Sequence, residues 1–322
     1  MTWSRHCRAQ SRVDSAGVGP IKGKRRQRGP RFRWALHLAL LPMALTVLFC
    51  YIGTVLWSVR ISTTTSRTFP ASDFVGLAQY VRLFNSERWL VSMQNMVLFG
   101  AVFMTLTLVI GFLLAVFIDQ KVRGESVLRT IFLYPYAMSF VATGLIWQWT
   151  LNPELGLQSA LRRMGLSGFT FDWIVTQDKV IYTVAFAAVW QMAGLVMAVL
   201  LAGLRGVDDE IWKAARIDGI PAWRVYVSIV LPVIAPSVAT ALVLLFLSVV
   251  KVYDVVVAMT GGGPGTASEV PAKFIIDYLF GRANVGLASA ASTVLLLTAV
   301  AAVAPWMYAR SRSERRAQLG AA

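Results

Sequence analysis

Long apolar segments separated by short polar stretches dominate the hydrophobicity pattern of this chain of 322 residues. Each apolar segment has at least the ~20 residues that a helix needs to cross the hydrocarbon core of a bilayer. Backbone polar groups find no water there, so helices are the expected form. The predicted spans are 34–57, 92–118, 129–150, 180–203, 226–250 and 285–309. We expect Pro135, Pro232 and Pro236 to bend or interrupt their helices.

Composition and charge give this pattern a class and an orientation. The chain is 57% hydrophobic and 15% charged, which predicts an all-α integral membrane protein with six transmembrane helices. Of its 31 Lys and Arg residues, 21 fall on the side that carries both termini and 10 on the other. The positive-inside rule makes the first side cytoplasmic, N-in and C-in. The expected domains are a basic, disordered cytoplasmic tail (1–33), a transmembrane domain (34–310) and a second cytoplasmic tail (311–322).

The polar loop 204–236 has the signature of a short helical hairpin. Asp208 or Asp209 can cap the N-terminus of a helix that reaches Asp218. Gly219 stands where a left-handed C-terminal residue belongs, and Pro221 prevents continuation of the helix. Such a short charged hairpin cannot span a bilayer. We expect it to project from the membrane and to present one helix to a soluble partner.

This loop resembles the EAA loop of the membrane subunits of bacterial ABC importers. The pattern is Glu-Ala-Ala, three residues, Gly, nine residues and Ile-x-Leu-Pro. The chain matches it at Ala214, Ala215, Gly219, Ile229, Leu231 and Pro232, with Lys213 in place of Glu. The resemblance implies that an ABC ATPase subunit is contacted through Lys213, Ala214, Ala215, Asp218, Gly219, Ile229, Leu231 and Pro232. An ordinary interhelical loop is the alternative.

The resemblance extends over most of the chain, from Phe74 to Tyr308. Residues 76–84 (GLAQYVRLF), 129–135 (RTIFLYP) and 260–264 (TGGGP) look like segments of the maltose-type sugar permeases. Residues 269–273 (EVPAK) look most like the glucose and α-glucoside branch. The resemblance implies the ABC type I importer permease fold in a bacterial cytoplasmic (inner) membrane. The implied partners are a second homologous permease, two ABC ATPase subunits, an extracytoplasmic sugar-binding protein and membrane lipids.

Several kinds of site are missing from the sequence. No G-x-x-x-x-G-K-[ST] occurs, so no bound cofactor is expected, and ATP and Mg would be used by the partner ATPase subunits. His6 and His37 form no metal cluster. The basic run 22–33 lacks a folded reader module, so nucleic acid is not an expected partner. The chain is therefore expected to be no enzyme.

Few residues within the membrane could recognise a sugar, which requires aromatic faces together with amides or carboxylates. The candidates for the substrate path are Trp147, Gln148, Asn152, Trp190, Gln191, Tyr253 and Asp254. Helix packing or an interfacial belt is the alternative for the tryptophans. Gln191 has an interhelical hydrogen bond as its alternative. Asp254 could instead pair with Lys251 at i,i+3.

Three other functions compete with a sugar importer. An ion-coupled secondary carrier predicts membrane-buried ionisable groups and inverted repeats, neither of which is evident. A membrane sensor or scaffold using the basic tail leaves the hairpin unexplained. An ABC importer permease for a related solute such as glycerol phosphate shares the hairpin.

Overall fold

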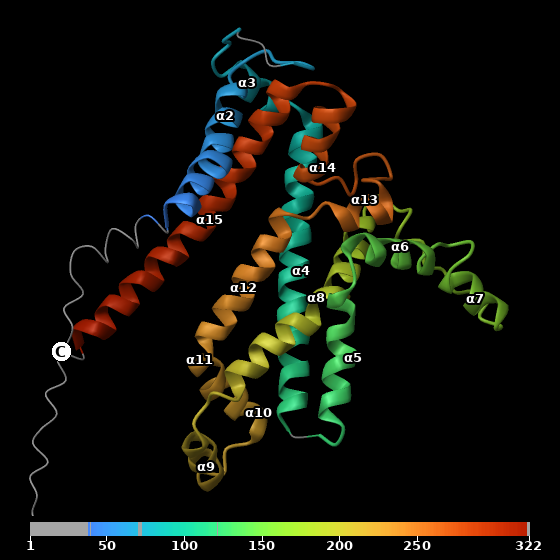
Figure 1. Ribbon diagram of the computed structural model, residues 1–322. Coiled ribbons are helices and arrows are strands. Elements are labelled where there is room, and N and C mark those ends of the chain that lie inside the picture. Colours follow the sequence, from blue (N-terminus) through green and yellow to red (C-terminus); the bar gives the residue numbers. More distant parts are fainter. Residues whose placement is uncertain (1–37, 39, 70–72, 121, 321–322) are drawn as a thin grey trace, which may run out of the picture. The chain divides into compact units, whose positions relative to one another are not determined.

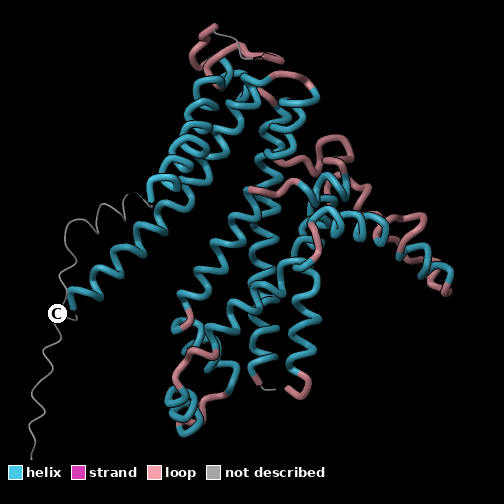
Figure 2. Tube along the Cα trace, viewed as in Figure 1, coloured by secondary structure: helices cyan, strands magenta, loops and turns pink. Residues whose placement is uncertain are grey.

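Helices form nearly all the regular structure of the protein (Figures 1 and 2). The computed structural model describes residues 38, 40–69, 73–120 and 122–320, so the predicted basic tail 1–33 lies outside the described residues. Within that described part, the sole β pairing is an isolated bridge between Thr64 and Phe74. The chain divides at Thr54 into two compact units, which are described in turn.

The described part of the first unit is helical and exposed. η1 (Val47–Gly53), a π-helical segment, lies in the first unit. It is followed by α2 (Thr54–Ile61), of which all but the first residue belongs to the second unit. The whole helical run Leu40–Ile61 is long and apolar enough to cross a membrane, and none of its most apolar window is buried inside the protein. Apolar residues on every face fit a helix that contacts lipid.

The second unit contains the remaining helices. Their bounds, in chain order, are α3 (Ala78–Phe84), α4 (Glu87–Asp119), α5 (Glu125–Ala137), α6 (Phe140–Thr150), α7 (Leu157–Arg163), α8 (Val180–Leu204), α9 (Asp209–Ile217), α10 (Ala222–Arg224), η2 (Val225–Val230), α11 (Leu231–Val233), α12 (Ala235–Val250), α13 (Asp254–Thr260), α14 (Pro271–Ile276), η3 (Asp277–Gly281) and α15 (Val285–Gly320).

The predicted spans are found in two forms. Among the described residues, four helical stretches are each long and apolar enough to cross a membrane: Leu40–Ile61, Glu87–Asp119, Val180–Leu204 and Val285–Ala304. Two further pairs, α5 with α6 and Ala222–Val233 with α12, pass the same test only together, because each pair is bent. The described chain thus has four unbroken spans, or six if each bent pair is one span.

The third predicted span, 129–150, is not continuous, which confirms the expectation that Pro135 bends or interrupts it. α5 and α6 meet at 96°. Pro135 lies inside α5 and lacks the N–H that would continue the helical bonding. The chain then turns extended at Met138, and the hydroxyl of Ser139 accepts from the N–H of Ala142 at 3.1 Å. The expected local bend is therefore a right-angle turn with a capped new helix.

A second break interrupts the fifth predicted span. The segment Ala222–Val233 meets α12 at 77°, and Ile234 lies at the junction. Pro232 and Pro236 flank this junction, and neither can donate a backbone hydrogen bond. The expectation that these prolines interrupt their helix is confirmed.

The core of the second unit is built around α8, which contacts α4, α5, α6, α12 and α13 (Figure 1). In its most apolar window, 72% of the residues are buried inside the protein. Glycine allows the closest approach. A Cβ on Gly194 would lie 2.0 Å from the carbonyl oxygen of Phe132 on α5. Another on Gly111 of α4 would lie 2.6 Å from a methyl of Val196 on α8.

We predict that Gly194→Ala destabilises the protein, because the new methyl group must push the backbone of α5 away from α8. Overpacking of this kind costs about 1–3 kcal/mol. The thermal midpoint in detergent and the amount of protein in the membrane should both fall. Gly53→Ala is the control, since its Cβ would meet Leu48 O at an ordinary 3.5 Å. Equal midpoints for the two variants would contradict the close packing of α5 on α8.

Candidate functional site

The hairpin built around α9 has both ends defined by local hydrogen bonds. The carboxylate of Asp208 accepts from the N–H of Glu210 at 3.0 Å and caps the N-terminus. At the other end Gly219 has φ +66°, the left-handed conformation that was predicted. The N–H of Ile220 bonds Ala215 O at 3.1 Å, and the N–H of Gly219 bonds Arg216 O at 3.2 Å. This pattern is a Schellman motif, which ends the helix and reverses the chain.

One face of α9 packs on the protein and the other is exposed. Ala215 is 4% exposed and belongs to the main hydrophobic core, against which Ile211 and Trp212 also pack. Lys213, Ala214, Asp218 and Gly219 are exposed. Ile217 is 86% exposed and Trp223 is 64% exposed. Apolar side chains held this far out of the fold mark a surface suited to a protein partner.

The returning segment of the hairpin, Ala222–Val233, is helical and carries the rest of the predicted coupling residues. Ile229 and Leu231 are half-buried and pack against the main core, and Pro232 is exposed. Pro232 precedes the 77° junction with α12. The hairpin therefore continues directly into the helix that borders the membrane cavity described below.

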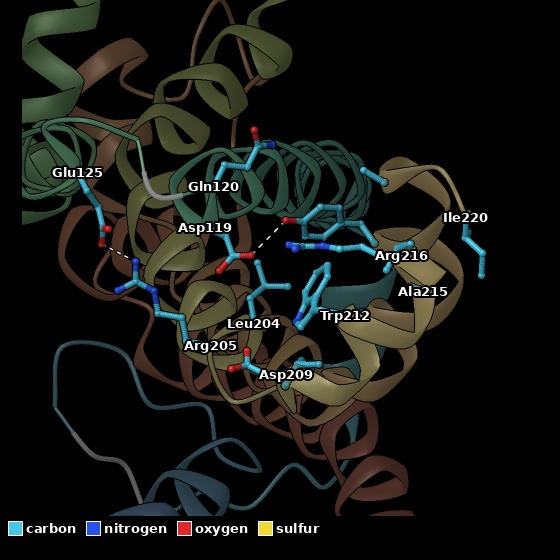
Figure 3. Close-up of a pocket in the computed structure, with 14 residues that line it drawn as sticks. Asp119, Gln120, Glu125, Leu204, Arg205, Asp209, Trp212, Ala215, Arg216 and Ile220 are labelled. Atoms are coloured by element: carbon cyan, nitrogen blue, oxygen red, sulfur yellow. Dashed lines mark hydrogen bonds and ion pairs between the residues drawn. The ribbon is translucent and has the colours of Figure 1, made fainter. Parts of the chain in front are cut away.

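A groove of about 1050 Å³ separates the hairpin from the ends of α4 and α5 (Figure 3). Two polar contacts cross it. The hydroxyl of Tyr226 donates to the Oδ2 atom of Asp119 at 3.1 Å. The guanidinium of Arg205 pairs with Glu125 at 2.5 Å. Neither contact was predicted, because the partners lie 107 and 80 residues apart in the chain.

A cavity of about 320 Å³ lies between the helices of the second unit. Aromatic side chains from three helices line it: Phe99 and Phe103 of α4, Tyr136 of α5 and Phe140 of α6. Polar groups enter at the end of α12, where Ser248, Lys251, Tyr253 and Asp254 also line the cavity. Apolar walls with a few polar groups are typical of a small-molecule site.

Two of the predicted substrate-path residues, Tyr253 and Asp254, line this cavity. Lys251 lines it as well. Lys251 and Asp254 are not among the ion pairs that the described residues form. The suggested Lys251–Asp254 pair is therefore wrong for this structure. The four aromatic wall residues were not predicted, since nothing in an evenly apolar helix indicates which face meets a cavity.

The other predicted path residues lie outside the lining of the cavity. Trp147 on α6 meets Trp190 edge-to-face at 5.7 Å, which is a helix-packing contact. The side-chain oxygen of Asn152 accepts from the N–H groups of Glu154 and Leu155 and so stabilises a turn. Gln148 is half-buried on α6.

Gln191 forms an interhelical hydrogen bond, which was the alternative to a place on the substrate path. It is 1% exposed. Its amide nitrogen donates to the carbonyl oxygen of Met138 at 2.8 Å. That carbonyl belongs to the break between α5 and α6, where helical bonding stops. The structure thus places Gln191 as a support of the break and not on the cavity wall.

An ion-pair network ties the start of α4 to the segment around α14. Arg88 bonds Glu269 at 2.7 Å and also contacts Asp277. Lys273 pairs with the same Asp277 carboxylate at 2.8 Å. Burial raises the pKa of Asp277, but the bonds from Lys273 and Arg88 outweigh burial and hold that pKa below its usual value. The network was not predicted, although the i,i+4 spacing of Lys273 and Asp277 was a local signal for part of it.

Separate hydrogen bonds from Asn95 and Ser268 hold the glycine-rich turn that precedes α14. The amide of Asn95 donates to the carbonyls of Thr266 and Glu269 at 3.2 and 3.0 Å. Ser268 donates its hydroxyl to Gly263 O at 2.7 Å. Gly261, Gly262 and Gly265 all have positive φ, so this stretch is a turn and not a helix interior.

Comparisons with known proteins agree with the hairpin and the membrane helices. Residues 123–315 match the family "Binding-protein-dependent transport system inner membrane component". A probable ABC transporter permease protein of Pyrococcus horikoshii is 33% identical over 90% of this chain and 100% of its own length. The trehalose/maltose transport system permease protein MalF of Thermococcus litoralis is 30% identical over 80% of this chain and 86% of its own.

A solved structure shares the fold. One chain of a bacterial alginate ABC transporter, crystallised with an alginate pentasaccharide-bound periplasmic protein, gives a TM-score of 0.75 at 21% identity. The similarity covers 88% of this chain and 96% of that one. With the exposed hairpin, the bent spans and the family match over most of the second unit, the chain belongs to the inner-membrane components of binding-protein-dependent transport systems, and is an ABC importer permease rather than an enzyme or an ion-coupled carrier.

Proposed function

We propose that this chain is a permease subunit of an ATP-driven importer for sugars, forming part of the path through the membrane. The observation that carries the proposal is the cavity, which borders α12, the helix that continues the hairpin. Its volume of about 320 Å³ lies at the lower end of the ~300–1,000 Å³ usual for ligand pockets. The wall aromatics would face the apolar side of a sugar ring, and Ser248, Tyr253 and Asp254 would bond hydroxyls.

The relatives support sugar as the solute class. The Thermococcus litoralis relative is named for trehalose and maltose, and the structural neighbour transports alginate. Glycerol phosphate is the second candidate solute. Lys251 lines the cavity and forms no ion pair within the described part of the chain, and such a cation suits a phosphate. A glucose-like or α-glucoside sugar remains the first choice.

The exposed apolar residues of the hairpin and the family membership support a proposed assembly. The exposed face of α9, with Ile217, and the neighbouring Trp223 of α10 would dock on an ABC ATPase subunit. The partners are a second homologous permease, two such ATPase subunits and an extracytoplasmic sugar-binding protein. ATP and Mg would be used by the ATPase subunits, and this chain would bind no cofactor. Motion of the ATPase pair would move the hairpin and, through Pro232, the helix bordering the cavity.

We further propose six spans in a bacterial inner membrane with both termini in the cytoplasm, counting each bent pair as one span. A reporter that is active only outside the membrane should then be active after Ser167 or Thr266. It should be silent after Val207 or Arg312. Activity after Val207 would place the hairpin outside and remove its coupling role.

The function is tested by uptake. Cells lacking this chain should lose uptake of one or more labelled mono- or disaccharides, and the restored chain should return it. Asp254→Asn should change uptake or sugar preference by roughly several-fold, as the loss of one polar contact would. Labelled glycerol phosphate is the second arm. Unchanged uptake of every sugar in the deletion strain, with lost uptake of glycerol phosphate, would reassign the solute.

The docking role of the hairpin is tested at Gly219. Gly219→Val places a β-branched residue at φ +66°, which is sterically costly. A Cβ at this position would meet no neighbouring atom within 4 Å, so the damage should be to the backbone turn. We expect normal insertion but poor co-purification of ATPase subunits and little uptake. Gly219→Asn is the control, since Asn tolerates this conformation. Normal uptake by the Val variant would remove Gly219 from coupling.

A further inference from the structure

The coupling hairpin, residues 204–236, faces two helix ends across the groove of Figure 3. Asp119 is the last residue of α4, and Glu125 is the first residue of α5. Each of these carboxylates is held by a side chain of the hairpin. The hairpin is thus connected to α4 and α5 by side-chain contacts that do not pass through Pro232 and the junction with α12.

The first connection is a chain of three side chains. Trp212 on α9 meets the ring of Tyr226 edge-to-face at 5.1 Å. Tyr226 in turn donates its hydroxyl to Asp119 at 3.1 Å. α9 is therefore linked through two rings and one hydrogen bond to the end of α4, the long helix that packs most extensively on α8.

The second connection is the ion pair between Arg205, at the end of α8, and Glu125, at the start of α5. Their side chains are 44% and 30% exposed. Ion pairs this exposed contribute little to stability. The pair is accordingly better suited to fixing the position of one helix end against another than to holding the fold together.

Both connected helices carry walls of the membrane cavity. Phe99 and Phe103 project from α4, and Tyr136 projects from α5. Helices are stiff elements along which a displacement at one end reaches the other. A movement of the hairpin passed to Asp119 and Glu125 would shift these aromatic walls. The continuous chain through Pro232 would move a different wall, that of α12.

We propose that the Tyr226–Asp119 hydrogen bond and the Arg205–Glu125 ion pair are coupling contacts through which the hairpin moves α4 and α5. All four are positioning residues, acting on the cavity through the helices that carry them. The inference deepens the proposed function and rests on it. It adds a second route of coupling, separate from the continuous chain at Pro232.

Tyr226→Phe tests the first contact, because it removes the hydroxyl and keeps the ring against Trp212. The complex with its ATPase subunits and binding protein is placed in vesicles, and imported solute per ATP hydrolysed is measured. We expect this ratio to fall several-fold while ATP hydrolysis continues. Asp119→Ala should give a similar ratio, and the double variant should be no worse than either. Tyr182→Phe is the control, a tyrosine whose hydroxyl has no partner among the described residues.

Charge reversal tests the Arg205–Glu125 ion pair. The double reversal can restore the pair, so the test does not depend on a single variant that could fail to fold. Glu125→Arg and Arg205→Glu should each lower the ratio, and the two together should restore it. A merely structural role predicts lower membrane abundance with an unchanged ratio per assembled complex. An unchanged ratio of imported solute to hydrolysed ATP in Tyr226→Phe would overturn this inference. The same result for Glu125→Arg and Arg205→Glu would also overturn it. Either result would leave the proposed function standing. A wild-type complex that hydrolyses ATP but imports no sugar or glycerol phosphate would overturn the proposed function, and this inference with it.

Discussion

The right-angle turn between α5 and α6 depends on a hydrogen bond from the Gln191 amide to the carbonyl oxygen of Met138, 2.8 Å long. A break in a helix leaves backbone groups without partners, and within a membrane no water is available to satisfy them. On the α6 side of the break, the hydroxyl of Ser139 accepts a hydrogen bond from the N–H of Ala142 and caps α6. Because the break is satisfied, α6 can leave the direction of α5 and lie on α13, where Gly144 lets Ala258 approach closely. The cavity lies beside this turn, with Tyr136 and Phe140 on its two sides.

Local signals made the hairpin predictable. A capping Asp, a left-handed Gly and a following Pro act within a few residues. Asp208 or Asp209 therefore predicted the start of α9, and Gly219 with Pro221 predicted its end. The unbroken spans were predictable from length and hydropathy, because these too are properties of consecutive residues. The prolines also marked the two breaks, although the angle of 96° between α5 and α6 follows from tertiary contacts.

The cavity was less predictable because its walls depend on contacts between distant helices. α4 is apolar on all sides, so its sequence does not distinguish Phe99 and Phe103 from residues that face lipid. Gln191 illustrates the same limit from the polar side. Its isolation in an apolar helix indicated a special role, but its partner lies 53 residues away. An amide can donate a hydrogen bond to a sugar hydroxyl as well as to a backbone carbonyl, so the residue type did not distinguish the two roles.

The two ends of the second unit are held in physically different ways. At one end Glu269 has a side chain only 2% exposed and pairs with Arg88. Removing one partner of a buried pair leaves a desolvated charge and is strongly unfavourable. At the hairpin end the side chains of the Arg205–Glu125 pair are 44% and 30% exposed, and a pair with this exposure contributes little to stability. A cavity between a fixed end and an adjustable end can be opened or closed by force applied at the adjustable one. Because the exposed face of α9 lies at that end, the distribution of burial favours a partner that acts through the hairpin.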